Sequence, residues 1–310
     1  NYQYPEKCHQ EKPTGTFNVS IGYSTSEKAI IGGSISQQNL LGTGRKLYFN
    51  AGIGDITNSF NASIIDPYIF DLNLSAGLGV SHYTREMDSY DYHIAGGNLS
   101  FVRPMTEFTK LNTRYKYERT KIYNIDIDAS HIIKDQAGTS STSSVTAGLN
   151  RNTIDNIMNP SKGSNSEISF ELAGGPFGAE NDFYKSIAQY GKYIPAGFWD
   201  STFFLKGTAG VIRGYNGKKI PIYEKFYVGG LHTVRGFKYG EAGPMDVYGD
   251  AVGGKNQLFF NLEWIFPIYV PVGLKGVIFF DAGHGFNKNK GFLLNDARTS
   301  AGTGIRWFSP

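Results

Sequence analysis

Strict alternation of apolar and polar residues is the feature that most constrains how this chain can fold. Residues 72–80 give a clear case, because Leu72, Leu74, Leu78 and Val80 are separated by Asn, Ser and Gly residues. Side chains of a β-strand point to opposite faces at every step, so such a segment has one apolar and one polar face. No segment shows a sustained apolar stripe at helical spacing, and no apolar run approaches the roughly 18 residues of a membrane-spanning helix. The chain is therefore predicted to be all-β.

The length of the apolar faces distinguishes a membrane barrel from a soluble sandwich, whose strands also alternate. These faces stay apolar for about nine or ten residues, which matches a tilted transmembrane strand of ~9–11 residues. Short turns rich in Pro, Gly and Asn also alternate with longer polar loops. The short turns are 39–45, 66–71, 103–107, 156–163, 194–200 and 266–273, and the longer loops are 124–139, 216–255 and 284–296. This arrangement predicts a transmembrane antiparallel β-barrel surrounded by a lipid bilayer.

About fourteen strands are predicted, and they form one barrel domain over residues 14–310. Their expected ranges are 14–24, 28–39, 46–56, 58–66, 71–84, 90–103, 107–123, 140–155, 163–175, 182–194, 201–215, 256–267, 274–286 and 297–309. The connection 216–255 is much longer than a simple turn requires, so it is a candidate for a structured loop.

Composition argues against several other classes of protein. The net charge of +3 is too small to indicate a nucleic-acid partner. Cys8 is the single cysteine and cannot form an internal disulfide bond, and no Cys/His cluster indicates a metal or another cofactor. Hydrolase and metalloprotease motifs are absent, and His284 lies three residues from Asp281, on the opposite face of one strand. We therefore expect neither enzyme activity nor a cofactor.

A cation in the long loop and two acids in apolar strands suggest an internal ion pair. The loop carries Val234-Arg235-Gly236-Phe237, and the acids are Glu263 and Asp281. Both acids must face the lumen, because a carboxylate facing hydrocarbon is far more costly. The planar guanidinium of Arg235 suits bidentate pairing with a carboxylate. We therefore expect the loop to fold inward onto these acids; the alternative is a solvated Arg235 with water-bridged acids.

Several short motifs, taken together and in order, resemble the barrel-assembly protein family of bacterial outer membranes (BamA). They are Glu11-Lys12-Pro13-Thr14-Gly15, Asn39-Leu40-Leu41-Gly42-Thr43-Gly44, Asp66-Pro67-Tyr68, Gly229-Gly230, Val234-Arg235-Gly236-Phe237, Asp281-Ala282-Gly283 and 301–307 followed by Ser309-Pro310. The resemblance extends from about Glu11 to the last residue. Any one motif would be weak, but the ordered set is specific.

The resemblance implies a sixteen-stranded barrel that follows periplasmic POTRA domains. About fourteen strands are present here, so the family's last two strands would lie beyond Ser309-Pro310, and residues 1–13 would be a linker from the POTRA region. A closed barrel of fourteen strands is the alternative. The resemblance also implies that Arg235, Gly236 and Phe237 hold the long loop inside the barrel, against Asp281.

The implied function is the folding and insertion of outer-membrane β-barrel proteins, without covalent chemistry. The implied partners are unfolded outer-membrane proteins, accessory assembly lipoproteins and the protein's own POTRA domains, in the outer membrane of a Gram-negative bacterium. The first strand would supply a seam, or lateral gate, for an incoming strand. Its expected seam residues are Phe17, Val19, Ser20, Ile21, Gly22 and Tyr23. A two-partner secretion transporter of the same superfamily and a passive porin remain as alternatives.

Overall fold

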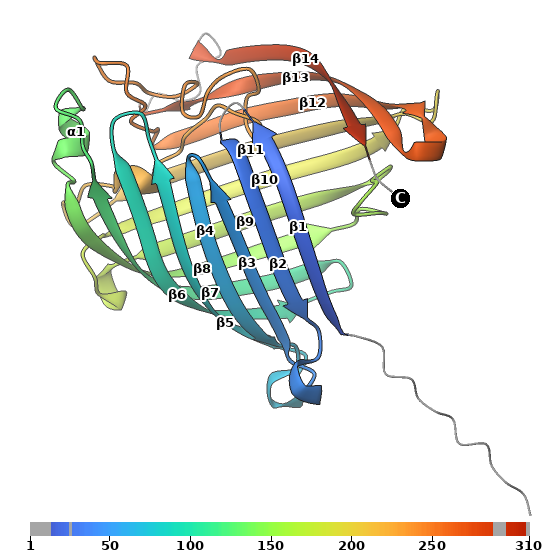
Figure 1. Ribbon diagram of the computed structural model, residues 1–310, viewed down its shortest axis with the longest axis horizontal. Coiled ribbons are helices and arrows are strands. Elements are labelled where there is room, and N and C mark those ends of the chain that lie inside the picture. Colours follow the sequence, from blue (N-terminus) through green and yellow to red (C-terminus); the bar gives the residue numbers. More distant parts are fainter. Residues whose placement is uncertain (1–13, 25–26, 288–295, 308–310) are drawn as a thin grey trace, which may run out of the picture.

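One antiparallel sheet accounts for nearly all of the described structure (Figure 1). The computed structural model describes residues 14–24, 27–287 and 296–307. Each strand pairs with its neighbours in chain order, and the sheet curves around a central space. The strands are β1 (Gly15–Ser24), β2 (Lys28–Gln37), β3 (Lys46–Gly54), β4 (Thr57–Asp66), β5 (Ser75–Glu86), β6 (Asp91–Pro104), β7 (Thr109–Tyr123), β8 (Gly138–Asn152), β9 (Gly163–Ala173), β10 (Phe183–Pro195), β11 (Thr202–Gly214), β12 (Asn256–Tyr269), β13 (Leu274–Phe286) and β14 (Arg298–Trp307).

The expected all-β barrel architecture is confirmed, with fourteen strands in the described residues. Within those residues, β1 pairs with β2 and β14 with β13, and no pairing joins β1 to β14. The predicted linker over residues 1–13 lies outside the described part of the chain.

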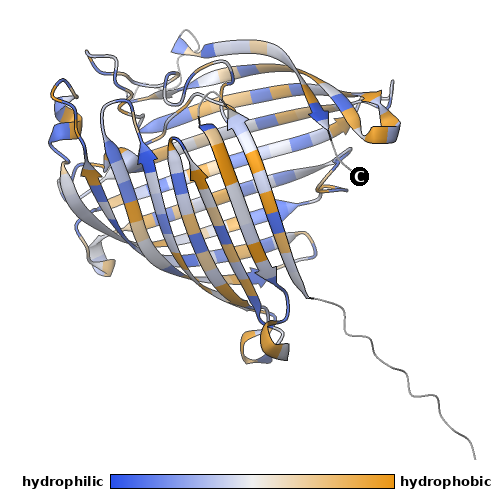
Figure 2. Cartoon of the chain, viewed as in Figure 1, coloured by the Kyte–Doolittle hydropathy of each residue, from blue (hydrophilic) through white to orange (hydrophobic). Residues whose placement is uncertain are grey.

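The outer face of the sheet is apolar, as the alternation predicts. Ile21, Leu78 and Phe280 are exposed, and each lies on an apolar stripe of its strand. Figure 2 shows the resulting pattern, in which hydrophobic and hydrophilic positions alternate along the strands. The inner face instead buries polar groups such as Thr120 and Asp281. An apolar outside and a polar inside are the reverse of the distribution in a soluble protein. This is the arrangement expected where lipid surrounds a polar interior.

Short helical turns occur in some connections, which the alternation did not predict. The α-helix α1 (His131–Lys134) lies in the 124–139 loop and begins at Ser130, whose side chain accepts a hydrogen bond from the Ile132 amide. The 3₁₀ turns are η1 (Leu40–Gly42), η2 (Ile69–Asp71), η3 (Gly175–Phe177), η4 (Ile222–Glu224) and η5 (Val270–Val272). No helix in the described ranges is both long and apolar enough to cross a membrane.

The fifth strand begins later than predicted. Its expected first residue was 71, whereas β5 begins at Ser75. Residues 69–74 instead form a wider turn, in which the Ile69 amide donates a hydrogen bond to the Leu74 carbonyl at 3.0 Å. The apolar residues of this turn continued the alternating pattern into the connection, so the pattern alone placed the boundary too early.

Candidate functional site

The long loop between β11 and β12 packs on the inner wall of the sheet. Val228 and Val234 are fully buried and cluster with Phe259 of β12, and Phe237 packs against the same cluster. Gly229 makes the tight path possible, because a Cβ there would lie 2.1 Å from the Lys238 carbonyl oxygen. The loop therefore lies packed in the barrel interior. Its inward folding was expected from the sequence.

Arg235 reaches Asp281 and Glu263, the two acids with which it was expected to pair. Its Nε and Nη2 donate to the two carboxylate oxygens of Asp281 at 2.6 Å each, and its backbone amide donates to Asp281 Oδ2 at 3.0 Å. Its Nη1 donates to Glu263 Oε1 at 2.6 Å. Asp281 is 0% exposed. The bidentate geometry is that of the stronger class of charge-assisted hydrogen bonds.

Burial and ion pairing have opposite effects on the pKa of the Arg235 guanidinium. Burial by itself would lower the pKa of its guanidinium, but hydrogen bonds and charge from Asp281 and Glu263 outweigh this and raise the pKa. The cation is therefore permanent, and the loop cannot be released by deprotonation of Arg235.

Residues of three adjacent strands form the surface on which Arg235 rests. Its guanidinium carbon lies 3.8 Å from the centre of the Phe279 ring, within range of a cation–π contact. Glu263, Phe279 and Gly302 occupy paired positions on β12, β13 and β14. A Cβ at Gly302 would lie 2.6 Å from the Phe279 ring, so glycine gives the ring its space.

Two further polar residues complete the network, and sequence reasoning missed both. Arg306 of β14 donates from Nη2 to both carboxylate oxygens of Glu263, at 2.9 and 2.7 Å. Asn261, directly opposite Asp281, donates to Asp281 Oδ1 at 2.8 Å and to the Thr233 carbonyl at 2.6 Å. The network of these residues with Arg235, here called the loop latch, thus joins the loop to β12, β13 and β14.

The sequence of this chain, including the loop packed inside the barrel, is similar to that of known proteins. The model of the Omp85 superfamily domain matches residues 39–310. The chain belongs to the Omp85 superfamily. It is 32% identical over 306 residues to the outer membrane protein assembly factor BamA of Nitratidesulfovibrio vulgaris, and 28% identical over 311 residues to BamA of Neorickettsia risticii. Both matches cover 97% of this chain but only 38% and 42% of the relatives' lengths.

A solved structure gives the same result for the fold. BamA from Haemophilus ducreyi lacking POTRA domains 1–3 has a TM-score of 0.83 to this chain at 22% sequence identity. The match covers 97% of this chain and 65% of that chain. This Omp85 chain is therefore a β-barrel of the bacterial outer membrane.

A second polar anchor holds the beginning of the Omp85 loop. Glu224 of η4 is buried and accepts hydrogen bonds from Lys185 of β10 at 3.0 Å and Lys116 of β7 at 3.4 Å. Lys185 also donates to the backbone carbonyl of Glu224 at 2.9 Å. Burial alone would raise the pKa of Glu224, but the two lysines lower it to about 2. This anchor lies in a loop without periodic sequence, so no pattern indicated it.

A third contact connects the loop with the first hairpin. Arg85 of β5 lies 4.1 Å from the ring centre of Tyr239 in the loop, and its Nη1 donates to Glu27 at 2.9 Å. Glu27 lies in the turn between β1 and β2, where it also accepts a hydrogen bond from Thr57 at 2.6 Å. The loop, β5 and the first hairpin are therefore in one contact chain.

The expected seam residues all lie on β1, which is exposed over residues 15–23. Phe17, Val19, Ile21 and Tyr23 form its outward apolar stripe. Ser20 pairs with Gly32 of β2, where a Cβ would lie 2.6 Å from the Ser20 hydroxyl. In the sheet order, ten strands separate β1 from β12, the strand that supplies Asn261 and Glu263 to the loop latch.

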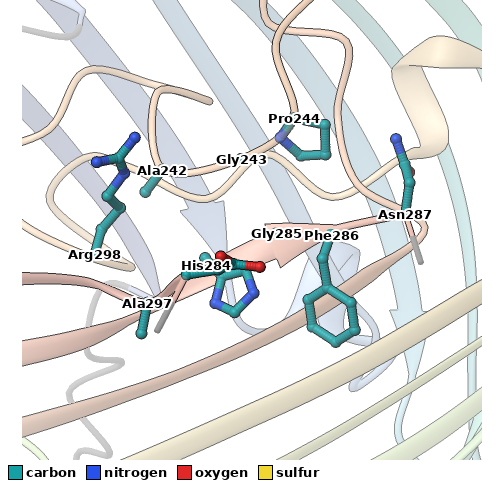
Figure 3. Close-up of a pocket in the computed structure, with 10 residues that line it drawn as sticks. Ala242, Gly243, Pro244, His284, Gly285, Phe286, Asn287, Ala297 and Arg298 are labelled. Carbon is teal, nitrogen blue, oxygen red and sulfur yellow. The ribbon is translucent and has the colours of Figure 1, made fainter. Parts of the chain in front are cut away.

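A cavity of about 470 Å³ lies beside the loop at the ends of β13 and β14 (Figure 3). His284 and Arg298 are among its lining residues, together with Pro244 of the loop. His284 packs against Phe286 with ring centres 5.0 Å apart. Among the described residues, no group of three or more His, Cys, Asp or Glu side chains could hold a metal ion.

Proposed function

We propose that this Omp85 barrel folds and inserts other β-barrel proteins into the outer membrane. The similarity to two assembly factors along 97% of the chain carries this proposal. The physical need is clear, because an unpaired strand in lipid leaves backbone groups unsatisfied at several kcal/mol each. A barrel that offers a strand edge to the incoming chain lowers that barrier.

The edge in this proposal is β1, which within the described residues pairs only with β2. Its outward apolar stripe would keep the template in contact with lipid, while its backbone groups pair with the substrate strand. The loop latch would hold the wall formed by β12, β13 and β14 in shape while β1 exchanges partners. The proposed partners are unfolded outer-membrane proteins, with accessory lipoproteins and POTRA domains assisting.

The proposal is tested by the rate at which an unfolded outer-membrane barrel folds in phospholipid vesicles that contain this chain. Folding is followed by the change in electrophoretic mobility on heating. We expect faster folding than in vesicles that contain an equal amount of a passive outer-membrane barrel of similar size. Equal rates in the two samples would overturn the proposal.

The same vesicles separate the two alternative functions. A porin would pass small solutes without affecting substrate folding. A secretion transporter would move a polypeptide across the membrane and leave it soluble on the other side. The measured products are therefore folded membrane barrel, released solute and translocated chain, and the proposal requires the first.

A further inference from the structure

Three short turns on one rim of the barrel place a bulky apolar side chain in a backbone conformation that disfavours it. The φ angles are 51° at Leu41, 55° at Phe70 and 52° at Trp199. In the described residues, every other non-glycine residue with positive φ is Lys, Asn, Asp or Ala. Large side chains rarely adopt this left-handed conformation, so three occurrences in equivalent places require a reason.

The three turns have the same geometry. The residue that follows each apolar side chain also has positive φ, namely Gly42, Asp71 and Asp200. A backbone hydrogen bond closes each turn, with donor–acceptor distances of 3.0, 3.1 and 3.1 Å between residues 43 and 40, 72 and 69, and 201 and 198. Two consecutive left-handed residues inside such a bond define a type I′ turn, whose usual first central residue is Asn, Asp or Gly.

Leu41 and Phe70 contact little of the protein, whereas the Trp199 ring is stacked on Trp264 of β12, with ring centres 6.0 Å apart. Leu41 is 91% exposed, Phe70 83% and Trp199 72%. Packing within the chain therefore does not explain the apolar residues at positions 41 and 70, and at position 199 it covers only one part of a side chain that is mostly exposed. The turns are also well defined, because a second backbone hydrogen bond spans each one, at 2.8, 3.0 and 2.8 Å. The side chains are held outward.

The remaining short turns of this rim carry exposed apolar residues as well. Ile157, Met105 and Val270 lie in the connections after β8, β6 and β12. Every short turn of the rim therefore has at least one, and the turns η1, η2 and η5 lie along one margin of the sheet in Figure 1. Apolar residues spread around a whole rim fit a surrounding medium better than one protein partner. They also continue the lipid-facing stripes of the strands.

We propose that Leu41, Phe70 and Trp199 are membrane anchors that insert into the headgroup region of the periplasmic leaflet. Short turns of outer-membrane barrels face the periplasm, which places this rim at that leaflet. Trp is enriched at such interfaces, and Trp, Phe and Leu side chains of interfacial segments are buried at the boundary between headgroups and acyl chains. The unfavourable turn conformation is tolerated because it directs each side chain away from the barrel and into the lipid.

The position of each turn is measured with a nitroxide spin label in lipid nanodiscs. Cys8 is replaced by Ser, and a single cysteine is introduced by Leu41→Cys, Phe70→Cys or Trp199→Cys. The control is Val247→Cys, since Val247 is 92% exposed but lies in the long loop of the opposite rim. Collisions with oxygen report lipid, and collisions with a water-soluble nickel chelate report water.

We expect a severalfold higher ratio of oxygen to nickel collisions at the three anchor positions than at the control. A ratio equal to that of the control would place the turns in water and overturn the proposal. Low collision rates with both reagents would place them under protein, either a partner or a second copy, and would overturn it as well.

A substitution distinguishes an anchor from a turn that only closes a hairpin. Leu41→Asn supplies the residue that a type I′ turn favours before Gly42, and it removes the apolar group. For an anchor, the urea midpoint of unfolding from vesicles falls, whereas for a simple turn it rises. Val247→Asn is the control and is expected to leave the midpoint unchanged. A rise for Leu41→Asn would contradict the proposal.

Discussion

Removal of the Arg235 side chain should open the loop while leaving the strands paired. In Arg235→Ala, Asp281 loses two hydrogen bonds of 2.6 Å and keeps those from Asn261 and the residue 235 amide. Glu263 keeps Arg306. Breaking a buried ion pair typically costs 3–5 kcal/mol. Because both acids keep other donors, we expect about 3 kcal/mol, at the lower end of that range.

This free energy corresponds to roughly a hundredfold change in the equilibrium between closed and open loop. The assay is hydrogen–deuterium exchange of the backbone amides from Val234 to Phe237, because Val234 is fully buried and the Arg235 amide donates to Asp281. Amides of β7 should be unchanged, since this strand does not contact Arg235. Protease sensitivity of the loop and the yield of heat-modifiable barrel give independent readouts.

The matched control is Lys238→Ala, which removes an exposed cation from the same loop. We expect exchange of residues 234–237 to remain at the wild-type rate in this variant. Two results would contradict this expectation: a change in exchange of less than about fivefold in Arg235→Ala, or an equal effect of Lys238→Ala. Either result would mean that the ion pairs contribute little to the position of the loop.

Other substitutions test the remaining contacts. The pKa of Glu224 is lowered to about 2 from its ordinary 4.5, so its contribution of roughly 3 kcal/mol exists above pH 4.5 and is lost as the pH falls toward 2. The stability difference between wild type and Glu224→Gln, measured by urea unfolding, should shrink over that pH range. Arg306→Gln should cost about 1–2 kcal/mol, because Glu263 keeps Arg235, and the loss is measured as increased exchange in β14. Gly302→Ala should displace the Phe279 ring and cost about 1–3 kcal/mol by overpacking, measured as a lower unfolding midpoint, whereas no change would show that the ring has room to move.

The strands were predictable because lipid on one side and a polar lumen on the other enforce a period of two. That constraint acts on every strand, so the order and number of strands followed from alternation and turns alone. It acts weakly at the ends of strands. The apolar residues of the 69–74 turn face outward and mimic strand residues, which is why β5 begins four residues later than expected.

The inward direction of the two acids was predictable from residue types, since a carboxylate in a lipid-facing strand must point inward. Residue types left a solvated Arg235 as an alternative, and the family resemblance favoured the pairing that the structure contains. The participation of Arg306 was not predictable. It depends on the register that puts Arg306 opposite Lys275, from where its side chain reaches across β13 to Glu263. Alternation fixes the face of a residue but not its height along the barrel. The sequence did contain an indication of this contact, because Arg306 is a cation within a predicted strand and a cation there needs an acidic partner or water.

Glu224 illustrates a different limit. Its partners Lys116 and Lys185 come from strands that are distant in sequence, and the loop between β11 and β12 has no period from which to infer a position. Only the curvature of the sheet brings the three together. The sequence gives the charge of each of these three residues, but it does not indicate that they are buried together in one contact.

In the proposed function, β1 pairs with a strand of an incoming barrel protein, and site-specific crosslinking detects that pairing at the strand itself. A photoreactive phenylalanine derivative is placed at Tyr23 of β1 or, as the matched control, at Tyr117 of β7, both of which are exposed. An unfolded outer-membrane barrel is then added to the chain in vesicles. We predict crosslinks to the substrate from position 23 and not from position 117. Equal crosslinking at the two positions, or none at position 23, would contradict the proposed role of β1.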